Sequence, residues 1–301
     1  MPATELRFRA MGSDAHVIVV GGPSASADLA RRRIDDLERR WSRFIDTSEV
    51  SELNRRAGEH VAVSAETRLL VGRAVEAWRL TGGGFDPTLL GAVIRAGYDV
   101  SFDLIHGDRQ RQSCDLLTGC TDIEITPETV RLPAGTGFDP GGIGKGLAAD
   151  IVLAEVLAGG ASGACINLGG DLRVAGVNPL GEAWTIGIDH PSIADPIALI
   201  GLTAGAVATS TTLRRRWDVD GSARHHLIDP ATGEPSDSDL DLATVIAGEA
   251  WIAEVLAKAV LLRGSDRAFD VIDDTTAYAL TVDHRGDVRT TAGFRNFIGG
   301  S

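Results

Sequence analysis

Apolar positions along this chain follow two periods, the alternation typical of strands and the wider spacing typical of helices. Residues 7–20 alternate between apolar and polar side chains, which predicts an opening strand or hairpin. From Leu29 onward, apolar residues recur at helical intervals and predict a helix that ends near Phe44. Ser64 is a typical N-cap for a second helix, and the three glycines from Gly82 stop it. The chain therefore begins with a strand pair and two helices.

The rest of the chain adds two helices and many short strands. Apolar runs predict one helix from Ile143 to Leu157 and a last helix from about Ala250 to Leu262. Hairpins are predicted over residues 122–132 and 277–291, where alternating runs flank a turn. Further strands are predicted at residues 164–168, 184–188, 206–210, 227–228 and 243–247. Because strands and helices do not alternate regularly, the sequence predicts an α+β fold rather than a βαβ sheet.

Composition limits the classes of function. No linker or repeat divides the 301 residues, so we expect a single domain over residues 1–301. The net charge of −13 argues against a nucleic-acid partner. The longest apolar stretch, Ile197 to Ala208, is shorter than the ~20 residues that span a bilayer, and it predicts a buried strand pair. Residues 1–10 lack an apolar core, so we expect no signal peptide, no membrane insertion and a cytoplasmic location. The cysteines lack metal-site spacing and are expected to be reduced thiols: Cys114, Cys120 and Cys165.

The segment from Phe138 to Gly146 places a carboxylate, several glycines and one lysine at the entrance to a predicted helix. Glycines let a backbone approach a ligand closely, and the N-terminus of a helix attracts anions. The segment is therefore typical of a pyrophosphate site, with Lys145 beside the phosphates. A glycine-rich turn that packs against a sheet explains the same residues equally well, so this segment alone does not decide between the two.

Three other segments carry residues with possible chemistry. Asn167 to Asp171 ends a strand with an amide, two glycines and a carboxylate, which suits a tight turn better than a ligand contact. His225 and His226 precede a turn, where the pattern fits a base but is more common for surface histidines. Glu254 and Lys258 lie four residues apart on the last helix. They form an exposed ion pair, or they have a role in binding. In the second case, Glu254 is an oxygen ligand for Mg²⁺ and Lys258 lies near the same anionic ligand.

Taken in order, these segments resemble the ApbE family, the FAD:protein FMN transferases. The matching motifs cover nearly the whole chain: Met11-Gly12-Ser13, Ser48 to Asn54, Phe85-Asp86-Pro87-Thr88, Asp139 to Lys145, Asn167 to Asp171, His226 to Gly233, and Ala253 to Ala257. The resemblance implies an ApbE-like, T-fold-related α+β unit with two lobes. Its sheets are expected to be mixed and largely antiparallel, with helices packed on them.

The resemblance also implies a substrate and a reaction. FAD is expected between two halves of the fold, where a Ser or Thr hydroxyl of an acceptor flavoprotein attacks the FMN phosphorus. In the implied reaction, Mg²⁺ binds the pyrophosphate and AMP is the leaving group. Positions that match the family's flavin contacts are Met11, Phe44, Gly84, Phe85, Asp86, Asp139, Lys145 and Ile228. By the same resemblance, His226 is the base or orienter of the acceptor hydroxyl, and Lys145 contacts phosphate.

The chain departs from the family's pattern at the metal site and at two other positions. The family's metal ligands fall here at the Gly142 carbonyl, at Glu254 and at Lys258. Glutamate still offers an oxygen ligand, but a lysine only donates hydrogen bonds and repels a cation. Either Lys258 turns away or its ammonium replaces part of the metal's charge, and the second case predicts weak metal dependence. Phe44 stands in place of a tyrosine, and Thr211 in place of a glycine.

Two other functions use the same residues. A flavoprotein that binds FAD without transferring it would keep the flavin and release no AMP. Hydrolysis of FAD to FMN and AMP would use water in place of the acceptor hydroxyl. A dinucleotide-dependent dehydrogenase is disfavoured, because no GxGxxG motif follows an early strand. The sequence favours the transferase over the binding protein and leaves transfer and hydrolysis open.

Overall fold

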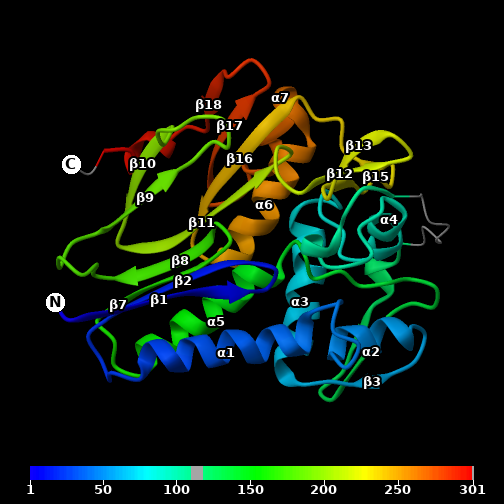
Figure 1. Ribbon diagram of the computed structural model, residues 1–301, viewed down its shortest axis with the longest axis horizontal. Coiled ribbons are helices and arrows are strands. Elements are labelled where there is room, and N and C mark those ends of the chain that lie inside the picture. The colour runs from blue at the N-terminus through cyan, green and yellow to red at the C-terminus, as the bar shows by residue number, and fades with distance from the viewer. Residues whose placement is uncertain (110–117, 300–301) are drawn as a thin grey trace. The chain divides into compact units, whose positions relative to one another are not determined.

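The computed structural model describes residues 1–109 and 118–299, and the chain divides into two compact units (Figure 1). Unit 1 consists of Met1–Asp36, Lys145–Thr211 and Asp239–Ser301, whereas unit 2 consists of Leu37–Gly144 and Thr212–Ser238. In the described part of the chain, no helix is both long enough and apolar enough to cross a bilayer. The single domain over residues 1–301 and the cytoplasmic location stay predictions.

Unit 1 contains one eight-stranded sheet in which every neighbouring pair is antiparallel (Figure 1). In spatial order its strands are β1 (Ala3–Ala10), β2 (Ser13–Val20), β7 (Gly163–Leu168), β8 (Asp171–Gly176), β11 (Ala204–Thr211), β16 (Leu240–Ala247), β17 (Tyr278–Asp283) and β18 (Val288–Thr290). The first and last strands of the chain thus form the two edges of this sheet. The predicted opening hairpin and the predicted hairpin over residues 277–291 are both confirmed.

The core of unit 1 follows from the period of two along these strands. Leu242 and Ile246 of β16 and Val207 of β11 face one apolar cluster, which the hairpin of β9 (Trp184–Ile188) and β10 (Ala198–Leu202) completes. The residues between them alternate to the opposite face, and helix α6 (Ala250–Leu262) packs on β11 and β16.

The apolar stretch from Ile197 to Ala208 gives two strands, as predicted, but they do not pair with each other. β10 pairs with β9, whereas β11 lies between β8 and β16. Ile200 and Leu202 of β10 share one buried cluster with Val207 of β11. The two strands therefore face each other across the core instead of lying side by side.

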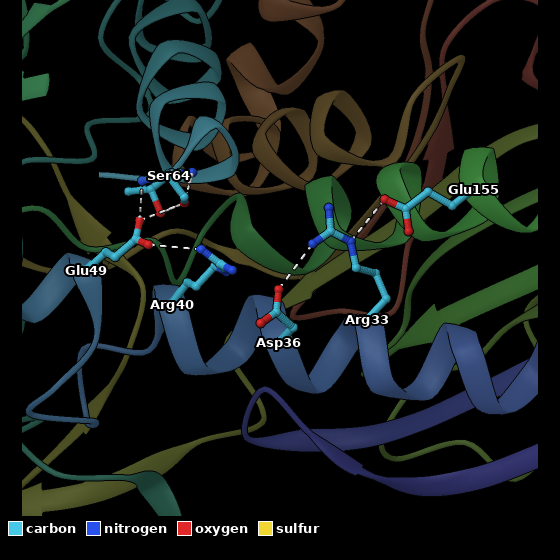
Figure 2. A network of polar contacts seen from close by, with 7 residues as sticks. Arg33, Asp36, Arg40, Glu49, Ser64 and Glu155 are labelled. Atoms are coloured by element: carbon cyan, nitrogen blue, oxygen red, sulfur yellow. Dashed lines mark hydrogen bonds and ion pairs between the residues drawn. The ribbon is translucent and has the colours of Figure 1, made fainter. Parts of the chain in front are cut away.

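Within unit 1, the first part of helix α1 (Ser26–Trp41) meets helix α5 (Gly144–Ala158) through an arginine. α1 begins in unit 1, and α5 follows the glycine-rich segment, as its sequence predicts. Arg33 of α1 donates to Asp36 at 3.2 Å and to Glu155 of α5 at 3.0 Å, as Figure 2 shows. α1 ends three residues before the predicted end at Phe44, because the Phe44 N–H donates to the Ser42 hydroxyl at 3.3 Å and the chain turns. A short helix, α7 (Gly264–Arg267), follows α6.

Unit 2 combines short helices with three small sheets (Figure 1). Its helices are α2 (Glu49–Arg55), α3 (Ala65–Leu80) and α4 (Leu90–Arg95). Its sheets, in spatial order, are β3 (Val61–Ala62), β6 (Thr129–Arg131) and β5 (Glu124–Ile125); β13 (Ser222–His225), β12 (Arg216–Val219) and β4 (Asp108–Arg109); and β14 (Ile228–Asp229) with β15 (Glu234–Pro235). β12 and β4 run parallel, so the sheets of the protein are mixed and largely antiparallel, as predicted.

Side-chain caps fix the helix starts in unit 2. The Ser64 hydroxyl accepts from the Thr67 N–H, which confirms Ser64 as the N-cap of α3. Glu49, at the start of α2, accepts from the Ser64 hydroxyl at 2.7 Å and from Arg40 at 3.1 Å (Figure 2). These contacts join the first turns of α2 and α3.

The remaining elements are single 3₁₀ turns, at Phe102–Leu104 and Cys120–Asp122 in unit 2 and at Ala268–Val271 and Phe294–Phe297 in unit 1. Cys120 and Cys165 are free thiols, as predicted, and burial raises the pKa of each to about 12. Cys114 lies outside the described residues.

Candidate active site

Two tight turns of unit 1 bring separate motifs together. Met11 and Gly12 both adopt positive φ, 51° and 65°, in the turn between β1 and β2. Gly169 and Gly170 do the same between β7 and β8, where the Asn167 side chain accepts from the Gly170 N–H at 2.9 Å. Asn167 therefore stabilises this turn, which agrees with the interpretation favoured from the sequence.

The two turns lie against each other and against Lys145. A Cβ added to Gly169 would lie 2.7 Å from the Ser13 Cβ and 3.9 Å from Cδ of Lys145. Only glycine fits this approach. The structure thus places the Met11-Gly12-Ser13 turn next to the stem of the lysine singled out as a phosphate contact.

Lys145 is held between two carboxylates that come from different elements. Its ammonium donates to Glu254 of α6 at 2.8 Å and to Asp171, the first residue of β8. Asp171 and Glu254 are 4% exposed each, so both charges lie away from solvent. The second oxygen of Glu254 accepts from the Gly146 N–H at 2.8 Å, in the first turn of α5. The carboxylates therefore converge on one cation at the beginning of a helix.

The pKa values of this cluster reflect its burial and its charges. Burial opposes the charged form of Lys145, but Asp171 and Glu254 outweigh that effect and raise the pKa of Lys145 above its usual value. Burial is the main cause that raises the pKa of Asp171, and the Lys145 and Lys258 charges act against it. Lys145 is thus a permanently charged group at neutral pH.

Lys258 lies one turn beyond Glu254 on α6 and is partly exposed. Its charge lowers the pKa of Asp171, so its ammonium acts on the same cluster. Glu254 hydrogen-bonds with Lys145 and Gly146 rather than standing as an exposed residue on the helix surface. Lys145, Asp171 and Glu254 therefore form a charged cluster in unit 1, on which the charge of Lys258 also acts.

In unit 2, the chain that leads into α5 is fixed by its own carboxylate. Asp139 accepts from the Gly141 N–H at 2.9 Å, and its backbone N–H donates to the Pro87 carbonyl at 2.8 Å. Gly142 is buried in this segment. The contact to Pro87 joins two of the predicted motifs, those that contain Asp86 and Asp139.

The predicted flavin contacts around Phe85 are well ordered by local hydrogen bonds. The Phe85 ring is 4% exposed, and its N–H donates to the Thr81 hydroxyl at 2.9 Å. Asp86 accepts from both the N–H and the hydroxyl of Thr88, at 2.7 and 2.5 Å. Gly84, which precedes Phe85, donates its N–H to the Thr81 carbonyl at 3.1 Å. Thr81 and Thr88 therefore hold this turn.

Phe44 and Ile228, two other predicted flavin contacts, differ in exposure. Phe44 is 38% exposed, whereas Ile228 is 6% exposed and packs with Val93 and Ala96 in an apolar cluster on α4. The sequence did not indicate a role for Arg43. In the structure, its guanidinium lies against the Phe44 and Tyr98 rings. Spacing could not signal it, because Tyr98 is remote in the chain.

The two adjacent histidines have different environments. His225 is 8% exposed; its Nε2 donates to the Ser236 carbonyl at 3.0 Å, and its Nδ1 accepts from the Leu227 N–H at 3.3 Å. Burial lowers its pKa, which favours the neutral ring that the hydrogen bond accepted by Nδ1 requires. His225 therefore serves the structure of this turn, whereas His226, the residue singled out as a base, is less buried.

A model of the ApbE family matches residues 11–281 of this chain, and the chain therefore belongs to that family. The FAD:protein FMN transferase of Vibrio cholerae is 26% identical over 276 residues, which cover 90% of this chain and 81% of that protein. The corresponding protein of Treponema pallidum is 29% identical over 245 residues, which cover 74% and 67%. The family resemblance found in the sequence is thereby confirmed.

Solved structures confirm the fold. The crystal structure of the ApbE protein of Thermotoga maritima superposes with a TM-score of 0.88 at 28% identity, over 98% of this chain and 99% of that one. The flavin transferase ApbE of Vibrio cholerae superposes with a TM-score of 0.84 at 24% identity, over 98% and 99%. The roles assigned to single site residues stay predictions.

Proposed function

We propose that this chain is an FAD:protein FMN transferase that moves FMN from FAD to a Ser or Thr hydroxyl of an acceptor flavoprotein. The observation that carries the proposal is the buried Lys145 ammonium at the start of α5, held by Asp171 and Glu254. A fixed cation at a helix N-terminus stabilises phosphate groups and the charge that develops on them. Family membership and the names of the relatives support the same activity.

Phosphoryl-group transfer depends on positioning and on neutralising charge more than on covalent catalysis. In the proposed step, the acceptor oxygen forms a bond to the FMN phosphorus. The bond from that phosphorus to the bridging oxygen breaks, and AMP leaves with that oxygen. His226 takes the proton of the hydroxyl, and Lys145 contacts the phosphates. Met11, Phe44, Gly84, Phe85, Asp86, Asp139 and Ile228 are the proposed contacts of the flavin nucleotide.

We also propose that the reaction uses Mg²⁺, which would supply charge neutralisation on the pyrophosphate. Asp171 and Glu254 offer buried carboxylate oxygens, the type of ligand that Mg²⁺ prefers, and in this structure both hydrogen-bond with the Lys145 ammonium. In the described residues, no cluster of three or more His, Cys, Asp or Glu could hold a metal. The family resemblance implies the Gly142 carbonyl as a further ligand, and phosphate oxygens of FAD would supply others. Lys258 is not a ligand, since an ammonium has no lone pair to offer.

Mass spectrometry after incubation with FAD tests the proposal. The purified protein is mixed with FAD, with Mg²⁺ or EDTA, and with a flavin-acceptor domain that carries a candidate Thr. A matched acceptor with Val at that Thr is the control. AMP release together with an FMN-sized mass gain on the Thr acceptor alone is the expected result. AMP and free FMN without labelling would indicate hydrolysis, and intact bound FAD in every mixture would indicate a flavin-binding protein.

A further inference from the structure

We propose that Arg43 is a positioning residue for flavin binding, because it holds the Phe44 ring and the Asp139 carboxylate in fixed places. This inference rests on the proposed function, in which Phe44 and Asp139 contact the flavin nucleotide. Arg43 itself is not assigned a contact with the substrate.

The contacts of Arg43 all lie within unit 2. Its guanidinium carbon lies 4.1 Å from the centre of the Phe44 ring and 4.7 Å from the centre of the Tyr98 ring. Its Nη2 donates to the Tyr98 carbonyl at 2.8 Å, and its Nε lies 3.5 Å from Oδ1 of Asp139. One planar cation therefore contacts two aromatic rings, a carbonyl and a carboxylate.

The burial of Arg43 gives these contacts their strength. Its side chain is 7% exposed, which is uncommon for a guanidinium. Cation–π attraction and charge-assisted hydrogen bonds are stronger where water is excluded. Because the guanidinium is planar and carries its donors in a rigid fork, each contact restricts the orientation of the others.

Phe44 is the residue whose position this arrangement decides. It follows the end of α1, and 38% of its surface is exposed. Arg43 and Tyr98, whose ring centre lies 5.7 Å away, pack against the Phe44 ring. A ring already held in one orientation loses less conformational freedom when a flavin stacks on it. Arg43 should therefore strengthen FAD binding without touching FAD.

The same guanidinium faces the loop that leads into α5. Asp139 Oδ1 already accepts from the Gly141 N–H, and Arg43 supplies the counter-charge for this carboxylate. Loss of Arg43 would thus loosen Phe44 and leave Asp139 without that positive neighbour. Both changes are expected to weaken binding of the flavin nucleotide and to leave the transfer step unaffected.

The test measures the dissociation constant of FAD by fluorescence anisotropy, together with transfer kinetics, for Arg43→Met and Arg43→Lys. Arg43→Met should raise Kd and KM for FAD by about five- to tenfold, with turnover at saturating FAD unchanged. Arg43→Lys keeps the charge but lacks the planar fork. Its Kd for FAD should therefore lie between those of the wild type and Arg43→Met. Arg40→Met is the matched control: Arg40 lies on α1 three residues earlier and pairs with Glu49 at 3.1 Å, so Kd should not change.

A double-mutant cycle with Phe44→Leu separates this role from a general structural one. If Arg43 acts through the ring, Arg43→Met should raise Kd less in the Phe44→Leu background than in the wild type. An equal rise in both backgrounds, or a wild-type Kd for Arg43→Met, would overturn the inference. If Arg43→Met does not fold, an unchanged Kd in Arg43→Lys would overturn it. Failure of the proposed function looks different, because the wild type itself would then give no FMN transfer.

Discussion

At the scale of single residues, Lys145 balances two buried carboxylates, and its removal is expected to be costly. Lys145→Met leaves Asp171 and Glu254 close together without the cation between them. Breaking a buried ion pair in this way lowers the free energy of unfolding by about 3–5 kcal/mol, and FMN transfer should be lost. Urea unfolding and the AMP assay measure the two effects. Arg73→Met, which removes a partly exposed pair with Glu76, should change stability far less.

His226 is the residue on which the proposed proton transfer depends. Replacement by Ala should abolish FMN transfer but leave the affinity for FAD unchanged, because the imidazole acts on the acceptor hydroxyl. AMP release and FAD anisotropy, measured on the same preparation, check this. An active variant would remove His226 from the mechanism.

The neighbouring His225 predicts a pH dependence of stability. Its folded-state pKa is lowered, by burial first and by Arg216 and Arg224 next. As pH falls through the usual histidine pKa of ~6.5, the unfolded chain gains a proton here that the folded chain does not, so stability decreases. His225→Asn should reduce this decrease, by at most about 1.4 kcal/mol per pH unit. Urea unfolding at about pH 7.5 and about pH 5.5 measures it; an unchanged difference between the two pH values would contradict the assignment.

At the scale of elements, the start of α5 lies close to the start of α6. A Cβ on Gly146 would lie 2.4 Å from the Ala250 carbonyl oxygen and 2.7 Å from the Trp251 nitrogen, both backbone atoms that cannot move alone. Gly146→Ala should therefore lower the free energy of unfolding by about 3 kcal/mol or more. Gly144→Ala is the matched control, since its Cβ would make ordinary contacts at 3.6 Å and beyond. Thermal unfolding of both variants checks this, and equal stabilities would contradict the close approach.

Long elements with local signals were predictable from the sequence. α3, α5 and α6 lie where the apolar spacing, the Ser64 cap and the glycines placed them. The hairpin of β12 and β13 was missed, because its four-residue strands contain too few alternations to be recognised. The end of α1 was misplaced because the Ser42 hydroxyl replaces a helix hydrogen bond, a local effect that apolar spacing does not record.

The site was predictable only in part, because local patterns in the sequence do not show which distant residues come together. The sequence singled out Lys145, Glu254 and the segment that ends at Asp171, but not that all three meet. Helix spacing suggested an exposed ion pair or a metal ligand at Glu254, whereas the structure shows a buried carboxylate that hydrogen-bonds with Lys145 and Gly146. Such pairings depend on which strands and helices become neighbours, and local patterns do not specify partners that are distant in the chain.

At the scale of the whole molecule, FAD binding should stabilise the folded chain. A ligand that binds only the folded state raises the free energy of unfolding by about 2.7 kcal/mol at a free concentration of about 100 times Kd. Urea unfolding with and without FAD measures this shift. AMP at the same concentration is the control that separates the flavin part of the ligand from the adenylate part. An equal shift with AMP would mean that the flavin adds nothing to binding.

The sheet of unit 1 has a consequence for synthesis of the protein. β2 pairs with β7, so Val20 of β2 cannot pair until Gly163 of β7 has been synthesised. Pairing between distant segments is slow, and an unpaired strand edge exposed in the meantime promotes aggregation. The nascent chain therefore carries an open β2 edge while all of α2, α3 and α4 are being made, and its yield in a cell should depend on chaperones that cover this edge.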